Sequence, residues 1–198
     1  MDLEQRIRQQ FESSASTALD TSAAIGAKIL QAAQRMVTAH DRQKKILICG
    51  NGGSAADALH FSAELLCRYQ RERPPLAAIA LSADTATITA TANDYAFDQI
   101  FSRQINALGR PGDLLIAITT SGNSPNILEA VNAAAGIGLD VVALTGRGGG
   151  ALAGLLRETD IELRIPSDST ARIQEAHAII IHSICDLIDL HITGEFQL

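Results

Sequence analysis

The chain has 198 residues, a length that suits one domain. Its net charge of −6 argues against a general nucleic-acid binder, and no apolar run is long enough to span a membrane. The N-terminus lacks a signal-peptide core, and the three cysteines lack metal-type spacing. These features predict a cytoplasmic protein whose cysteines stay reduced.

Residues 2–40 carry apolar side chains at helical spacing, and Asp20, Thr21 and Ser22 interrupt that pattern. We interpret the interruption as a cap between two helices. Such an amphipathic pair must bury its apolar face, either on its own sheet or on a neighbouring subunit. We therefore divide the chain into an N-terminal helical oligomerisation segment, 1–40, and a domain that spans 41–198.

From Lys45 onward, short apolar runs alternate with helical stretches. This alternation is typical of a parallel sheet that is covered by helices on both faces. The sequence thus predicts an α/β, doubly wound fold with five strands, at Ile46–Cys49, Ala77–Leu81, Leu114–Ile118, Val141–Thr145 and Ile161–Ile165.

A glycine turn, Gly50-Asn51-Gly52-Gly53-Ser54, joins the first strand to a helix. Glycines allow close backbone approach, and the N-terminus of a helix favours an anion, although such a turn can also be an ordinary connection. His60 and Glu64 share one face of the following helix. A pair at this spacing is often a solvated ion pair, but its place after an anion-type turn favours a functional role.

A second polar turn follows the third strand, with hydroxyls at Thr119, Thr120, Ser121 and Ser124 ahead of a helix. Hydroxyls and free backbone N–H groups can bind a phosphate monoester without lysine, which makes this turn the better phosphate candidate. The dipeptide Asn93-Asp94, by contrast, is typical of a turn when it is taken alone.

The last helix, predicted at about Ala171 to His191, carries several polar residues in an apolar run. Gln174 and His182 lie on one ridge. Glu175 and His182 would pair equally well by spacing, so this pattern by itself leaves a structural role open.

Taken together, these segments resemble the sugar isomerase (SIS) domain and, within it, the phosphoheptose isomerase family. The resemblance covers nearly the whole chain and rests on CGNGGSAADALHFSAEL, ERPPLAAIAL, ANDYAFDQIFSRQINALGRPGD, TTSGNSPNI, ALTGRGGG and ARIQEAHAIIIH. It implies a flavodoxin-like fold in which 41–198 form the phosphosugar-binding domain. It also implies a homotetramer with active sites at subunit interfaces.

The resemblance further implies which residues form the site. It implies one zinc ion per subunit, held by His60, Glu64, Gln174 and His182, with Glu64 and His182 as the catalytic pair. It implies substrate contacts from Asn51, Gly52, Gly53, Glu64, Asn93, Asp94, Thr119, Thr120, Ser121, Ser124 and Gln174. Position 119 is threonine where the family commonly has serine, which retains the hydroxyl.

The implied reaction is the isomerisation of D-sedoheptulose 7-phosphate to D-glycero-D-manno-heptose 7-phosphate, an early step toward ADP-heptose and the lipopolysaccharide core. Two alternatives stay open: a non-catalytic phosphosugar-binding regulator, and a SIS protein that associates with a replication initiator. The pattern of the latter lacks an acidic residue at position 64 and a histidine at position 182. Both are present here, which favours the enzyme.

Overall fold

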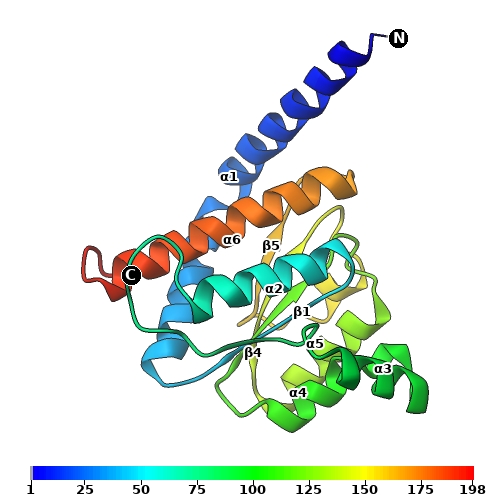
Figure 1. The fold of residues 1–198 in the computed structure, drawn as a ribbon, viewed down its shortest axis with the longest axis vertical. Coiled ribbons are helices and arrows are strands. Elements are labelled where there is room, and N and C mark those ends of the chain that lie inside the picture. The colour runs from blue at the N-terminus through cyan, green and yellow to red at the C-terminus, as the bar shows by residue number, and fades with distance from the viewer. Residues whose placement is uncertain (1) are drawn as a thin grey trace.

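The structure, a computed structural model, describes residues 2–198. A single five-stranded parallel sheet forms its centre, in the order β2-β1-β3-β4-β5 (Figure 1). The strands are β1 (Ile46–Gly50), β2 (Ala78–Ala80), β3 (Leu114–Ile118), β4 (Asp140–Thr145) and β5 (Ile161–Arg164). The doubly wound, flavodoxin-like sheet predicted from the sequence is therefore confirmed.

The helices cover both faces of this sheet because successive strand residues point to opposite sides. Ile46 and Ile48 face a core made with α1 (Leu3–Asp41), α2 (Gly53–Leu66) and α6 (Thr170–Ile192). Leu47 and Cys49 face a second core, made with α4 (Ser102–Leu108) and α5 (Pro125–Ile137). Three short elements complete the fold: α3 (Thr85–Asp94) and the 3-10 helices Phe97–Gln99 and Ala151–Gly154.

The N-terminal segment is one continuous helix, so the predicted helical pair is wrong. Asp2 caps it by accepting hydrogen bonds from the backbone N–H groups of Glu4 and Gln5. At the predicted break, the Thr21 hydroxyl donates to the carbonyl oxygen of Thr17 at 2.7 Å. Bonding back by one turn satisfies a hydroxyl inside a helix, so this polar stretch does not interrupt α1.

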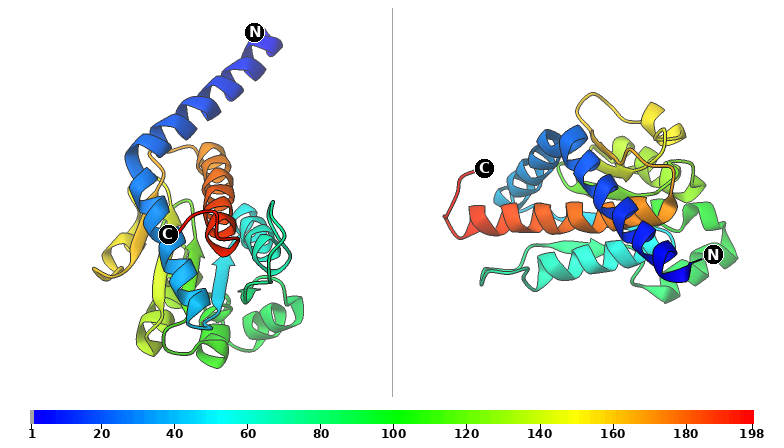
Figure 2. Two further views of the ribbon diagram at one scale, coloured as in Figure 1. Left: turned by 90° about the vertical axis from the view of Figure 1, so that its left-hand side faces the viewer. Right: turned by 90° about the horizontal axis from the view of Figure 1, so that it is seen from above.

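The two halves of α1 have different surroundings. The second half packs against α6 and the sheet and buries Ala33 and Met36 completely. The first half projects away from the body (Figures 1 and 2) and leaves Leu3, Ile7, Phe11 and Leu19 exposed, Phe11 by 74%. A projecting helix with an exposed apolar stripe suits contact with another protein surface.

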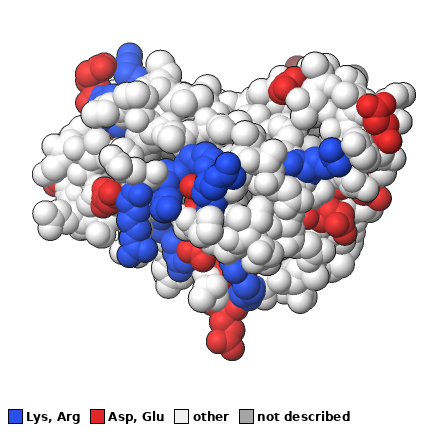
Figure 3. All heavy atoms as spheres, turned by 90° about the horizontal axis from the view of Figure 1, so that it is seen from below, with Lys and Arg blue, Asp and Glu red and all other residues white. Residues whose placement is uncertain are grey.

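The charges on the underside of the molecule are of mixed sign. Lys and Arg side chains gather near the middle of the face in Figure 3, with Asp and Glu among them. Within residues 2–198 no helix combines the length and apolar character needed to cross a bilayer.

Candidate active site

Two polar loops meet at the carboxyl ends of the central strands. Gly50 at the end of β1 pairs in register with Ile118 at the end of β3, so the loops that follow these strands are neighbours. The strand order reverses at this point of the sheet, because β2 lies on one side of β1 and β3 on the other. Ligands of doubly wound proteins bind at such a reversal.

The first loop, 51–54, is held between α6 and α5. Gly53 lies against α6 so closely that a Cβ atom there would come within 2.3 Å of Gln174 Nε2. The side chains of Asn51 and Asn126 exchange two hydrogen bonds of 2.8 and 2.9 Å, and Asn126 is buried in the first turn of α5. The amide of Asn51 is thus oriented by the helix that follows the second loop.

The second loop, 119–124, is shaped by its own hydroxyls. Thr119 Oγ1 accepts from Gly122 N at 3.3 Å, and Ser121 Oγ accepts from Asn123 N at 3.2 Å. Gly122 has a φ of +67° and lies so close to Gly149 that no side chain fits there. Ser124 occupies the N-cap position of α5 but makes no side-chain cap bond. Pro125 has no backbone N–H, and the N–H groups of Ile127 and Leu128 donate to the carbonyl oxygen of Ser124, so the first turn of α5 keeps the N–H of Asn126 for an anion.

Two histidines face each other between α2 and α6, which lie side by side (Figures 1 and 2). His60 Nε2 and His182 Nε2 are 2.8 Å apart, with their rings edge-on at 81°. Glu64 Oε1 lies 3.7 Å from the other ring nitrogen of His60, Nδ1. Residues that are far apart in the sequence thus form a compact group of two imidazoles and one carboxylate.

The His60–His182 contact bears on the predicted metal. Two imidazole nitrogens this close need a positive centre between them, either the proton of one tautomer or a cation. Two imidazoles with a carboxylate nearby suit zinc or a similar divalent ion, whereas the Gln174 amide is placed by its contact with Gly53. Within residues 2–198, however, no three His, Cys, Asp or Glu side chains converge as a ready cation site. The four-residue zinc site therefore stays a prediction.

Comparison with known proteins assigns the family. Residues 10–146 match the SIS domain model. The chain is 58% identical over 185 residues to a phosphoheptose isomerase of Shewanella denitrificans, covering 93% of this chain and 94% of that one. Its structure is similar to a phosphoheptose isomerase from Francisella tularensis, with a TM-score of 0.93, 49% identity and coverage of 96% and 99%. A phosphoheptose isomerase from Neisseria gonorrhoeae gives a TM-score of 0.90 at 47% identity, covering 94% and 98%.

The chain belongs to the phosphoheptose isomerase family. The resemblance predicted from the sequence is thus confirmed. Membership of this family makes the group around His60, Glu64 and His182 the candidate catalytic centre, and loop 119–124 the candidate phosphate site.

Two predicted substrate residues lie outside this group. Asn93 and Asp94 end α3, where Asn93 Nδ2 donates to Asp94 Oδ1 at 2.8 Å. Asp94 lines a hollow of about 530 Å³ together with residues of α4. No hydrogen bond or ion pair joins either residue to the other candidates in the described part of the chain, so their role in this phosphoheptose isomerase family member stays a prediction.

Burial changes the acidity of two side chains near the site. Burial raises the pKa of Asp57, one turn before His60, to about 6, and the charge of His60 opposes this rise. The Asp57 Oδ2 atom is buried without a hydrogen-bond partner among the described residues. On α6, burial lowers the pKa of His177 to about 4, against the effect of its hydrogen bond to Thr145 O.

Several residues that shape the site were not predicted from the sequence. Asn126 orients Asn51, and Tyr69 stacks on His182 with ring centroids 5.5 Å apart. Asp189 and Arg73 form a completely buried ion pair at 2.6 Å. The one available signal was the charged pattern RYQRER after α2, which reads as a solvated loop until its partners on α6 are known.

Proposed function

We propose that this protein is an aldose–ketose isomerase that converts D-sedoheptulose 7-phosphate to D-glycero-D-manno-heptose 7-phosphate. The single observation that carries the proposal is the convergence of His60, Glu64 and His182 between α2 and α6, in a chain of the phosphoheptose isomerase family. The product would feed the assembly of ADP-heptose for lipopolysaccharide in the cytoplasm.

The phosphate end of the substrate binds at loop 119–124 in this proposal. The hydroxyls of Thr119, Thr120, Ser121 and Ser124 and the backbone N–H of Asn126 in the first turn of α5 would donate to its oxygens. Asn51, Gly52, Gly53 and Gln174 would contact the sugar on the way to α2, and Asn93 and Asp94 would complete the site. Holding the far end of the substrate fixes the position of C1 and C2.

Isomerisation moves a proton from C1 to C2 through a cis-enediol. We assign the transfer of the carbon-bound proton to Glu64, whose carboxylate removes the proton from C1 and returns it at C2. His182 then handles the proton of the sugar oxygens as the acid/base partner. The short contact between His182 and His60 keeps the imidazole in a fixed orientation for this task.

His60, Glu64, Gln174 and His182 would hold the zinc ion. When bound, the metal would supply charge that polarises the carbonyl and stabilises the enediolate oxygens.

Assembly into a homotetramer is part of the same proposal. The exposed apolar side chains on the projecting half of α1 support it, because they would lose contact with water in a subunit interface. In a tetramer with active sites at subunit interfaces, Asn93 and Asp94 of one subunit would contribute to the active site of its neighbour.

The proposal is tested by incubating the metal-loaded protein with sedoheptulose 7-phosphate and following formation of the aldose by NMR. We expect turnover by the wild type and a loss of about 10²–10⁴-fold in His182→Gln. His191→Gln, the same change further along α6, is the matched control and should retain activity. A wild type that binds the sugar phosphate without turnover would contradict the isomerase and favour the regulator.

A further inference from the structure

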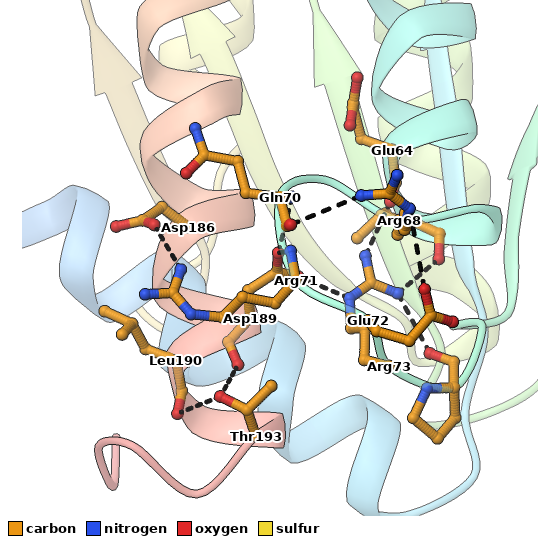
Figure 4. Close-up of polar contacts among 12 residues, drawn as sticks. Glu64, Arg68, Gln70, Arg71, Glu72, Arg73, Asp186, Asp189, Leu190 and Thr193 are labelled. Atoms are coloured by element: carbon orange, nitrogen blue, oxygen red, sulfur yellow. Dashed lines mark hydrogen bonds and ion pairs between the residues drawn. The ribbon is translucent and has the colours of Figure 1, made fainter.

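We propose that residues 67–73, here named the anchored loop, position the catalytic imidazole of His182 through the ring of Tyr69. This inference rests on the proposed function of His182. The loop follows α2 directly and crosses to the C-terminal half of α6 (Figure 4). Tyr69 is a positioning residue in this account and does not itself transfer a proton.

The ring of His182 is fixed on two sides. Tyr69 covers one flat face, with centroids 5.5 Å apart and an interplanar angle of 21°. His60 meets its edge, with Nε2 atoms 2.8 Å apart. Aromatic stacking limits rotation of the imidazole about its side-chain bonds. The tyrosine therefore helps to aim the ring nitrogen that faces His60.

Tyr69 can do this only if its own backbone is held. Asp189, buried in α6, accepts hydrogen bonds from Gln70 N at 3.0 Å, Arg71 N at 2.9 Å and Arg73 Nε at 2.6 Å. Three donors on one buried carboxylate fix the two residues that directly follow Tyr69 and the end of the loop. Although burial alone would raise the pKa of Asp189, these bonds hold it below its usual value.

The same arginine connects the loop to the helix of Glu64. The guanidinium of Arg73 donates to the carbonyl oxygens of Glu64 at 2.7 Å and Leu65 at 3.0 Å, and so satisfies the C-terminal end of α2. Figure 4 shows the Glu64 side chain pointing away from this arginine, and its Oε1 atom lies 3.7 Å from His60 Nδ1 instead. One buried ion pair thus joins the helices that carry Glu64 and His182.

A further set of contacts reinforces the loop. Arg71 pairs with Asp186 at 3.1 Å and with Glu195 at 2.7 Å, which ties the loop to α6 and to the chain beyond it. The Tyr69 hydroxyl makes no hydrogen bond to the residues described, whereas its ring packs against the core beside α6. The ring is therefore the part of Tyr69 that matters in this proposal.

The test compares Tyr69→Phe, which keeps the ring, with Tyr69→Leu, which removes it. In the full-length, metal-loaded protein we expect Tyr69→Phe to keep kcat within about 2-fold of the wild type. Tyr69→Leu should lower kcat by about 10-fold or more and leave KM within about 3-fold, because the phosphate is held elsewhere. Tyr95→Leu is the matched control, since Tyr95 contacts Arg103 and not His182.

Three further readouts separate positioning from a merely structural role. Combining Tyr69→Leu with His182→Gln should cost no more than His182→Gln alone, because Tyr69 acts through that ring. The NMR cross-peaks between the ring protons of His182 and His60 report the position of the imidazole, and they should weaken in Tyr69→Leu and persist in Tyr69→Phe. That comparison needs no turnover, so it decides the positioning role even if the isomerase assignment fails. The melting temperatures of both variants show whether a loss of kcat reflects a loss of folded protein.

Unchanged kcat in Tyr69→Leu would overturn the proposal. Equal losses in the phenylalanine and leucine variants would also overturn it, since they would assign the effect to the hydroxyl. A loss of kcat that is matched by an equal loss of folded protein would also overturn it, since Tyr69 would then act only through the stability of the core.

Discussion

His177 should make the stability of the protein fall in mild acid. It lies completely buried in α6, and its Nε2 atom bonds to the carbonyl oxygen of Thr145 at the end of β4 at 3.1 Å. Its Nδ1 atom has no hydrogen-bond partner in the described chain. Protonation would therefore place an unpaired N–H in the core, which explains why burial lowers the pKa of His177 from 6.5 to about 4.

The sign and size of the effect follow from this difference. Between these two pKa values the unfolded chain binds a proton at residue 177 and the folded chain does not, so acid favours unfolding. The contribution to stability is complete above the unfolded value and is lost as the pH falls toward 4. A shift from 6.5 to about 4 corresponds to about 3 kcal/mol in total, of which about 2 kcal/mol is lost between pH 7 and 5.

The measurement is urea unfolding, followed by circular dichroism, of the wild type and His177→Gln at a fixed protomer concentration. Glutamine can still donate to the Thr145 carbonyl but does not titrate, so the variant should lack this part of the pH dependence. The difference between the two proteins cancels the contributions of the other titrating groups. Equal changes in the unfolding free energy from pH 7 to 5 in both proteins would refute the reasoning.

Three more predictions concern the loops and the assembly. Asn126→Ala removes both hydrogen bonds that orient Asn51, each worth about 1 kcal/mol. The value of kcat/KM should therefore fall by about 10-fold or more in steady-state kinetics. An unchanged kcat/KM would contradict the role of Asn126 in positioning Asn51. Ser124→Ala and Ser121→Ala should each raise KM about 10- to 100-fold, because each removes a hydrogen bond to the charged phosphate. Only Ser121→Ala should also loosen the loop, since Ser121 Oγ accepts from Asn123 N. Unchanged KM in both variants would show that this loop is not part of the site. Replacing Ile7 and Phe11 together by Glu should lower the oligomeric state in light scattering while helicity is retained; an unchanged assembly would show that the exposed half of α1 is not the interface.

The parts of the fold and site that could be predicted depend on local patterns. The strand runs and the two loops could be located because buried parallel strands read as apolar runs and helix N-termini follow glycine or hydroxyl-rich turns. The continuity of α1 could not, because Thr21 has two ways to satisfy its hydroxyl, and only the packing of the helix selects the bond back to Thr17.

Long-range partners were the other missing part. Asn51 was predicted as a ligand contact, but its pairing with Asn126 depends on how β1 and β3 place their loops together. The stacking of Tyr69 on His182 likewise depends on where Asp189 holds the loop. Neither relation has a fixed spacing in the sequence, so no periodicity could predict it.

The proton-transfer role of Glu64 can be measured by running the reaction in D₂O. A base that takes a proton from C1 and returns one to C2 should introduce deuterium at C2 of the aldose and at C1 of recovered sedoheptulose 7-phosphate. Glu64→Gln, with its metal content matched to the wild type, should bind the substrate but lose both exchange and turnover by about 10²–10⁴-fold. Near-wild-type turnover in Glu64→Gln, with no deuterium in the product of either protein, would contradict the account.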